Sequence, residues 1–418
     1  MRILLVLPAG EKVRVTQEAP KVPRRGILRF SILPLTTVAA LTPPGHEVSL
    51  CDENVQALDF DADVDLVGVT FMTALAPRAY EIAAEFRRRG RCVVAGGFHP
   101  TFLPDEAAQH FDAVVVGEAE GAWPRLLEDF EAGRLRRVYQ NDRPCDPSMI
   151  PVPRRDLTSG SARHYVTTNA VQTGRGCRHA CRYCSISAFH RQSHRNRPLE
   201  SVLRELRGVP RHFMFVDDNI MADRDYARAL FRAMIPMRKR WVAQCPLEIA
   251  DDEELLRLAG EAGCIGLFIG VETLNDDNLA AVEKGFNDSR GYRLRIARIR
   301  GAGIGIVAGI IVGMDGDSPA TFENTLRFLR QTGIDAVQVN IMTPLPGTPL
   351  FADFQAAGRI VDRDWSHYDF RHCVMRPARM TARQVQDGAD WVYSQFYRLT
   401  ALACASFVLS SPWDGSQP

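Results

Sequence analysis

Apolar residues in the first third of the chain fall into short continuous runs separated by amphipathic stretches. Continuous apolar runs are typical of strands buried on both faces, as in parallel sheets covered by helices. Between two of the runs, residues 76–89 have the apolar spacing of a helix. The alternation predicts an α/β, Rossmann-like (doubly wound) domain over residues 1–140, with its ligand beyond the carboxyl ends of the strands. The expected strands are Ile3–Leu7, Glu47–Cys51, Leu66–Phe71, Cys92–Ala95 and Ala113–Val116.

A second alternation follows a proline-rich stretch, residues 141–165, which we interpret as a linker. Over residues 166–350, six strand-helix units predict a partial (β/α)6 TIM-type barrel, in which functional residues gather on the loops after the strands. Residues 351–418 are expected to form a small C-terminal aromatic segment that ends in a helix over 381–406. The expected barrel strands are Tyr165–Thr173, His212–Val216, Trp241–Cys245, Gly266–Gly270, Gly305–Val312 and Ala336–Ile341.

The composition narrows the class of partner. Lys and Arg number 51 against 50 Asp and Glu, a net charge of +1, which argues against binding nucleic acid or an anionic membrane. No apolar run reaches the roughly 18 to 20 residues of a membrane helix, and the nearest, Leu399–Leu409, is too short. The first residues lack the pattern of a secretory signal. We therefore expect a cytoplasmic protein that acts on a small molecule.

Ten cysteines in such a chain are not a disulfide framework, because thiols stay reduced in the cytoplasm. Seven are scattered singly and are expected to be small buried hydrophobic residues. These are Cys51, Cys92, Cys145, Cys245, Cys264, Cys373 and Cys404.

The other three, Cys177, Cys181 and Cys184, have the spacing C-x3-C-x2-C and follow the first strand of the second alternation. Three thiolates on a four-iron cluster leave one iron open to another ligand, whereas electron-transfer clusters usually take four cysteines. Zinc is the alternative, and it would need a fourth ligand at set spacing. The histidines near the triad are His179, His190 and His194.

This spacing, with aromatic Tyr183 before the third cysteine, resembles the radical S-adenosylmethionine superfamily. The resemblance implies a 4Fe-4S cluster on Cys177, Cys181 and Cys184, whose open iron chelates S-adenosylmethionine. An electron from the cluster then breaks the sulfonium bond and yields a 5'-deoxyadenosyl radical. The resemblance also implies an external electron donor such as flavodoxin or ferredoxin.

Other residues on the barrel loops fit the same family. By resemblance, Asp217 and Asp218 stand where the family contacts the methionyl amine, and Asn219 offers an amide oxygen beside them. A helix N-cap is the alternative role for these three. Glu272, directly after a strand, suits two ribose hydroxyls. Gly309 and Gly313 would let the nucleoside approach the backbone of a strand.

The motifs TPLPGTPL, GRI and WSHYDFRHCVMRPARMT resemble the subgroup with an N-terminal cobalamin-binding domain. The pieces compatible with that cofactor are Thr70, the pair Gly96 and Gly97, and the sequence GEAEG at 117–121, which could equally be a strand-to-helix turn. The loop 8–15 lacks the histidine of an Asp-x-His-x-x-Gly motif, so we expect cobalamin without a histidine lower ligand. The alternative is that the domain has lost the cofactor and serves as a scaffold. His99 is expected to be a loop or core histidine.

The resemblance implies an enzyme that methylates an unactivated carbon of a small-molecule substrate, such as a natural product or a lipid-like compound. Two S-adenosylmethionine molecules would be consumed, one to supply the methyl group through cobalamin and one to supply the radical. The same radical could instead start a cyclisation, ring contraction or rearrangement without methyl transfer. A third hypothesis is a non-catalytic iron-sulfur module that senses redox state.

Overall fold

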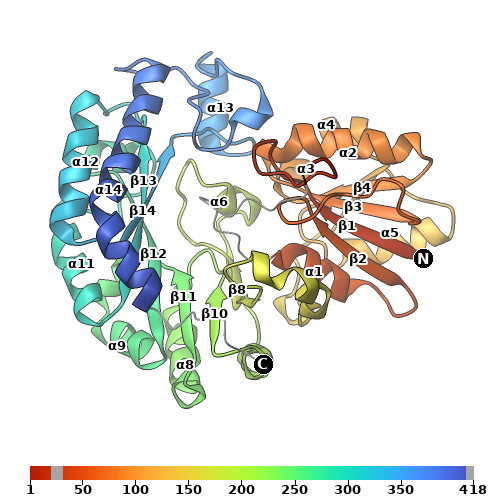
Figure 1. Ribbon diagram of the computed structural model, residues 1–418, viewed down its shortest axis with the longest axis horizontal. Coiled ribbons are helices and arrows are strands. Elements are labelled where there is room, and N and C mark those ends of the chain that lie inside the picture. Colours follow the sequence, from red (N-terminus) through yellow and green to blue (C-terminus); the bar gives the residue numbers. More distant parts are fainter. Residues whose placement is uncertain (20–31, 411–418) are drawn as a thin grey trace.

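A computed structural model describes residues 1–19 and 32–410, with the side chains of 399–410 left out. The apolar stretch Leu399–Leu409 and Cys404 are therefore outside the described side chains. Figure 1 shows two sheets, each with its own helices, and the short helix α6 (Ser185–Phe189) between them. Among the described residues, no helix combines the length and hydropathy that a bilayer crossing requires.

The N-terminal sheet is parallel throughout and has the order β2-β1-β3-β4-β5-β6. Alternate residues of β1 enter different cores: Leu4 and Val6 pack with α2 and α4, whereas Ile3 and Leu5 pack with α1 and α5. Burial on both faces explains the continuous apolar runs and confirms the doubly wound fold. The strands are β1 (Arg2–Leu7), β2 (Glu47–Asp52), β3 (Leu66–Thr70), β4 (Cys92–Gly96), β5 (Ala113–Val116) and β6 (Val138–Gln140). The helices are α1 (Leu33–Leu41), α2 (Ala76–Arg88), α3 (Phe98–Phe102), α4 (Pro104–His110) and α5 (Ala122–Glu131).

The strand order reverses between β1 and β3, since β2 lies on one side of β1 and the later strands lie on the other. Ligands of open α/β sheets bind at such a switch point, outside the carboxyl ends of the strands. Those ends carry the loop 8–15 after β1 and Thr70 at the end of β3.

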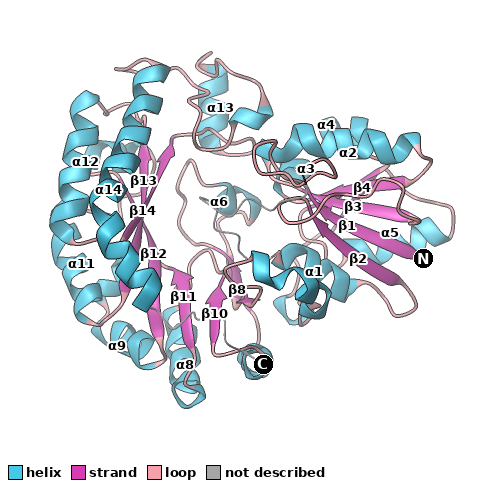
Figure 2. Cartoon of the chain, in the orientation of Figure 1, coloured by secondary structure: helices cyan, strands magenta, loops and turns pink. Residues whose placement is uncertain are grey.

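The second sheet is also parallel and has the order β14-β13-β12-β11-β10-β7, which confirms the partial barrel. Its strands are β7 (Ala170–Val171), β10 (His212–Phe215), β11 (Arg240–Gln244), β12 (Cys264–Glu272), β13 (Gly305–Val312) and β14 (Ala336–Ile341). Its helices are α7 (Leu199–Gly208), α8 (Arg224–Met234), α9 (Glu253–Glu261), α10 (Asp276–Ala281), α11 (Tyr292–Gly301) and α12 (Pro319–Thr332). Figure 2 shows these helices outside the strands, with the inner face turned towards α6.

Two segments complete the molecule. The antiparallel ribbon of β8 (Gly174–Gly176) and β9 (His194–Asn196) encloses α6 and the three cysteines. Beyond α13 (Pro349–Ala356), the long helix α14 (Ala382–Ser410) packs on α12 and β14, where Tyr397 bonds to the backbone of Val337. The C-terminal helix therefore covers the edge strand of the barrel.

The structure differs from the expected strands in several places, and the ribbon strands β8 and β9 were not predicted. The strand expected over Tyr165–Thr173 is only Ala170–Val171, because Tyr165 turns away and donates to Asp52 of the first domain at 2.8 Å. The short strand β6 was not predicted, because only Tyr139 of its three residues is buried.

Candidate functional site

The three cysteines lie on one loop between β8 and α6. All three are free thiols; Cys181 is buried, and Cys177 and Cys184 are half-buried. Burial raises the pKa of Cys177, and it raises that of Cys181 to about 12, against which the charge of Lys284 acts. The described residues hold no group of three His, Cys, Asp or Glu side chains close enough to share one metal ion. Thiols that each bind a different iron of a cluster need not converge on one point.

Glycine is required where the loop begins. Gly176 has a φ of +85°, and a Cβ there would lie 2.1 Å from the Ser193 carbonyl oxygen. His194 Nδ1 lies 3.0 Å from the Gly176 carbonyl oxygen. The loop therefore starts from a tightly closed ribbon rather than from open chain.

The acidic residues after β10 lie against the start of this loop. Asp217 is fully buried, and its carboxylate accepts hydrogen bonds from the Thr173 amide (3.0 Å), the Thr173 hydroxyl (2.7 Å) and the Gly174 amide (2.7 Å). The Asp218 carboxylate accepts only one, from the Gly176 amide at 3.2 Å, among the described residues. Asn219 Nδ2 lies 4.0 Å from the Cys177 sulfur. Asn219 Oδ1 accepts from the Met221 amide at 3.0 Å. Asp217 thus shapes the loop and Asn219 holds the turn after β10, whereas Asp218 keeps the most capacity for a ligand.

Glu272, at the end of β12, forms a buried ion pair with Lys284. Lys284 also donates to the Tyr183 hydroxyl at 3.4 Å, which connects the pair to the cysteine loop. Glu272 has a φ of +66°, unusual for a residue with a side chain, and a bulge in β12 accompanies it. Sequence analysis did not single out Lys284. The available signal was that lysine is rare in this chain and that this one comes 12 residues after Glu272.

The two barrel glycines make room for protein side chains. A Cβ at Gly309 would lie 3.1 Å from the ring of Phe268, and one at Gly313 would lie 3.0 Å from Val385 of α14. Gly313 also has a φ of +91°. Packing against these side chains is therefore a structural reason for glycine at both positions, and contact of the two glycines with a nucleoside stays a prediction.

Thr70, Gly96 and Gly97 come together at the carboxyl ends of β3 and β4, where Thr70 pairs with Gly96. Gly97 has a φ of +106°, and a Cβ there would meet the Phe71 carbonyl oxygen at 2.8 Å. Gly96 faces freer space, with Val115 Cβ nearest at 4.0 Å. A side chain at Gly96 would therefore meet no clash, whereas one at Gly97 would, and contact of these three residues with cobalamin stays a prediction.

His99 is fully buried, and its Nε2 lies 2.9 Å from the Tyr80 hydroxyl. It packs against Phe71 and against Trp365 from the C-terminal segment. Its expected place as a core histidine is confirmed. The single cysteines Cys51, Cys145, Cys245, Cys264 and Cys373 are buried as expected, and Cys92 is half-buried.

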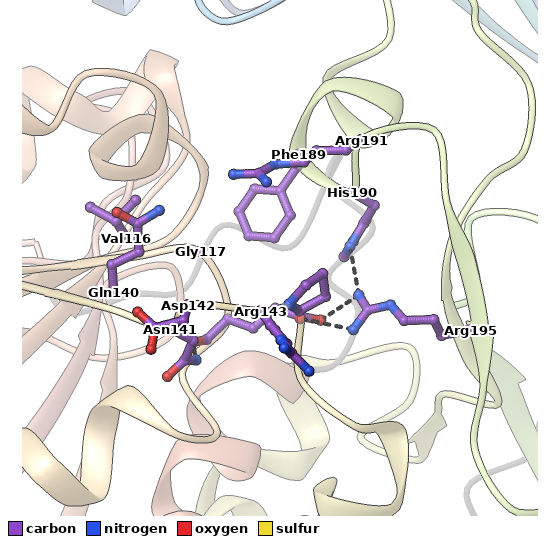
Figure 3. Close-up of a pocket in the computed structure, with 12 residues that line it drawn as sticks. Val116, Gly117, Gln140, Asn141, Asp142, Arg143, Phe189, His190, Arg191 and Arg195 are labelled. Atoms are coloured by element: carbon purple, nitrogen blue, oxygen red, sulfur yellow. Dashed lines mark hydrogen bonds and ion pairs between the residues drawn. The ribbon is translucent and has the colours of Figure 1, made fainter.

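A shallow pocket, open to solvent, lies where the carboxyl ends of β5 and β6 meet the segment after the cysteine loop (Figure 3). Phe189, at the end of α6, packs against Phe98 of the first domain with the two rings tilted and their centroids 4.8 Å apart. The first domain is therefore in direct contact with the helix that follows the cysteine loop. The lining residues are Val116, Gly117, Glu118, Gln140, Asn141, Asp142, Arg143, Pro144, Phe189, His190, Arg191 and Arg195.

Comparison with known families matches both halves of the chain. Residues 171–329 match the Radical SAM superfamily, and residues 32–127 match the B12 binding domain. The B12 binding match covers β2 to β5, with Thr70, Gly96 and Gly97, and the Radical SAM match covers β8 to β13, with the cysteine loop.

Curated relatives extend over most of the chain. The bacteriochlorophyllide d C-12(1)-methyltransferase of Chlorobaculum tepidum is 30% identical over 382 residues, which are 88% of this chain and 83% of that protein. The hopanoid C-2 methylase of Rhodopseudomonas palustris is 29% identical over 80% of this chain and 67% of that protein.

A solved structure has the same fold. The radical S-adenosylmethionine methyltransferase TsrM from Kitasatospora setae, with cobalamin and a 4Fe-4S cluster bound, superposes with a TM-score of 0.67. It is 19% identical, and the match covers 94% of this chain and 85% of that one. Taken with the matched domains and the relatives, the chain belongs to the radical S-adenosylmethionine superfamily, in the subgroup that carries an N-terminal cobalamin-binding domain.

Proposed function

We propose that the protein is a cobalamin-dependent radical enzyme that methylates an unactivated carbon of a small molecule. The observation that carries the proposal is that the ends of the cysteine loop contact both domains: the Gly176 amide donates to Asp218 after β10, and Phe189 of α6 packs against Phe98 after β4. Substrate bound there would lie close to both domains. Both cofactors act on one substrate only if their sites adjoin in this way.

The cluster, when bound, supplies the electron that cleaves S-adenosylmethionine, and cobalamin, when bound, supplies the methyl group. Cys177, Cys181 and Cys184 would hold the cluster. Three free thiols on one loop, one buried and two half-buried, fit it, because they need only lose their protons to become thiolate ligands.

Asp218 and Asn219 would accept hydrogen bonds from the methionyl ammonium of S-adenosylmethionine. Glu272 would accept from the ribose hydroxyls, with Lys284 holding its carboxylate in place. Asp217 serves them indirectly by fixing the backbone of residues 173 and 174. Gly309 and Gly313 would allow the nucleoside near β13.

Thr70, Gly96 and Gly97 would border the cobalamin site. Glu120, in the loop after the neighbouring strand β5, has an Oε2 that is buried with no hydrogen-bond partner among the described residues, and this atom would be able to accept one from a ligand amide. The loop 8–15 contains no histidine, so the lower face of the cofactor would have no histidine ligand. Such a site eases changes of cobalt oxidation state.

The relatives guide the choice of substrate. Two methylate large, mainly apolar ring systems, a chlorophyllide and a hopanoid, as their names state. We therefore propose a mainly apolar polycyclic substrate of this kind, with an external one-electron donor such as flavodoxin or ferredoxin. Cyclisation or rearrangement by the same radical, without methyl transfer, remains the alternative.

The test is anaerobic reconstitution with iron, sulfide and hydroxocobalamin, followed by incubation with S-adenosylmethionine labelled in its methyl group. Chlorophyllide and hopanoid extracts serve as substrates. The proposal predicts label in a product with one added carbon. A new product of altered mass that carries no label would establish the alternative instead.

A further inference from the structure

Four charged residues join the two domains beside the cysteine loop. Glu118 and Glu120 follow β5 of the first domain, and Arg175 and Arg195 come from the ribbon β8–β9. Arg195 donates to both oxygens of Glu118, at 3.0 and 2.9 Å. Arg175 donates to Glu118 at 3.1 Å and to Glu120 at 2.5 Å.

The network is buried and balanced in charge. The side chains are 8% (Glu118), 2% (Glu120), 14% (Arg175) and 20% (Arg195) exposed. Burial opposes ionisation of Glu118, but hydrogen bonds from Arg195 and the charge of Arg175 lower its pKa overall. Two carboxylates thus face two guanidinium groups in a mostly buried network, where ion pairs are screened less by salt than at the surface.

The two arginines are also direct cross-strand neighbours. In the register of the ribbon, Arg175 pairs with Arg195, and Gly176 pairs with His194. Like charges directly opposite each other destabilise a pair of strands. The glutamates neutralise this repulsion, so the ribbon is complete only with the first domain docked. Cys177 follows the ribbon immediately.

We propose that Glu118 and Glu120 are positioning residues that fix the cysteine loop against the cobalamin-type domain. In this way they would set the distance and orientation of the cluster relative to the bound substrate. The inference rests on the proposed function, since it is methyl transfer that needs both sites in fixed relation. The proposal also gives the sequence GEAEG at 117–121 a role in domain docking, which differs from the two roles considered for it above, a cofactor loop and a strand-to-helix turn.

Glu118→Gln tests the network with little loss of volume. Arg195→Gln removes the partner of Glu118. The double variant Glu118→Gln/Arg195→Gln removes both charges of this pair and leaves the ion pair between Arg175 and Glu120 in place. The contacts of Phe98 with Phe189, and of Trp365 with Glu106 at 2.8 Å, remain to hold the domains together. Glu261→Gln, which breaks an exposed ion pair with Arg257 on α9, is the matched control.

Three readouts separate positioning from mere stability: chemical unfolding, amide hydrogen exchange of residues 174–196, and 5'-deoxyadenosine released per methyl group transferred. In Glu118→Gln we expect hydrogen exchange of the ribbon amides to become about tenfold faster, because the ribbon opens more easily. We also expect the ratio of 5'-deoxyadenosine to methylated product to rise about tenfold, because a small displacement of the reacting groups lowers the rate of methyl transfer steeply. The double variant should regain stability, since no buried charge is left unpaired, but should keep both increases. The control should match the wild type.

The inference would be overturned if Glu118→Gln changed neither the hydrogen exchange of the ribbon amides nor the ratio of 5'-deoxyadenosine to product. It would also be overturned if both quantities returned to wild-type values in the double variant. If the wild type transfers no methyl group, the proposed function fails. Ribbon exchange still decides the positioning role in that case, because it is measured without substrate.

Discussion

Lys284 and Glu272 form a buried ion pair beside the cysteine loop, and Lys284 reaches the hydroxyl of Tyr183 from the same position. Gly270 makes the pair possible, since a Cβ there would lie 2.2 Å from Glu272 Oε1. One lysine therefore links the proposed ribose contact to the loop proposed to hold the cluster.

Replacing Lys284 should separate these two roles. Lys284→Met leaves a buried carboxylate without a partner and should lower the free energy of unfolding by about 3 kcal/mol. Glu272→Gln/Lys284→Met should regain most of that stability, yet bind S-adenosylmethionine more weakly than the wild type. Urea unfolding and anaerobic calorimetric titration measure the two effects. Full affinity in the double variant would exclude Glu272 as a ligand contact.

Asp217 and Asp218 are adjacent but should respond in opposite ways to the same change. Asp217→Asn replaces an acceptor of backbone hydrogen bonds and should lower the free energy of unfolding by about 2 kcal/mol. Asp218→Asn should cost little stability at pH 7, because burial already raises the pKa of Asp218 to about 6. It should weaken S-adenosylmethionine binding about tenfold through loss of a charged acceptor. Equal effects of the two variants on binding would refute this division.

His190, in the pocket of Figure 3, should make stability depend on pH. Burial lowers its pKa to about 4, from about 6.5 in an unfolded chain. The folded state therefore holds the neutral ring, and this contribution is present above pH 6.5 and lost as the pH falls towards 4. The measurement is urea unfolding of the wild type and His190→Gln between pH 7 and 4.5. The wild type should lose about 1–2 kcal/mol more than the variant over that range, and parallel curves would contradict the assignment.

Local patterns carried most of what could be predicted. The central strands β1, β3, β4, β5 and β13 are continuous apolar runs, because both of their faces are covered. The triad is recognisable because its ligands come from a single loop. In contrast, the local pattern predicts Tyr165 to be part of an apolar strand, but its hydrogen bond to Asp52 of the other domain holds it out of the sheet.

The pairings that shape the site could not be predicted, because they join residues far apart in sequence. Glu118 and Arg195 are 77 residues apart, and Trp365 reaches Glu106 across 259. Arginines are frequent in this chain, and nothing local distinguishes Arg175 from an exposed one. The positive φ of Glu272 likewise follows from a bulge that only the packed barrel reveals.

The most direct test of the central claim is reductive cleavage of S-adenosylmethionine by the reconstituted protein, compared with Cys177→Ala, Cys181→Ala and Cys184→Ala. Cys92→Ala, at a half-buried cysteine of β4, is the control. We predict about four iron atoms per chain and dithionite-dependent 5'-deoxyadenosine for the wild type and the control, with 5'-deoxyadenosine lost in each of the three variants. Absence of 5'-deoxyadenosine from iron-loaded wild type, or its persistence in the variants, would contradict the account.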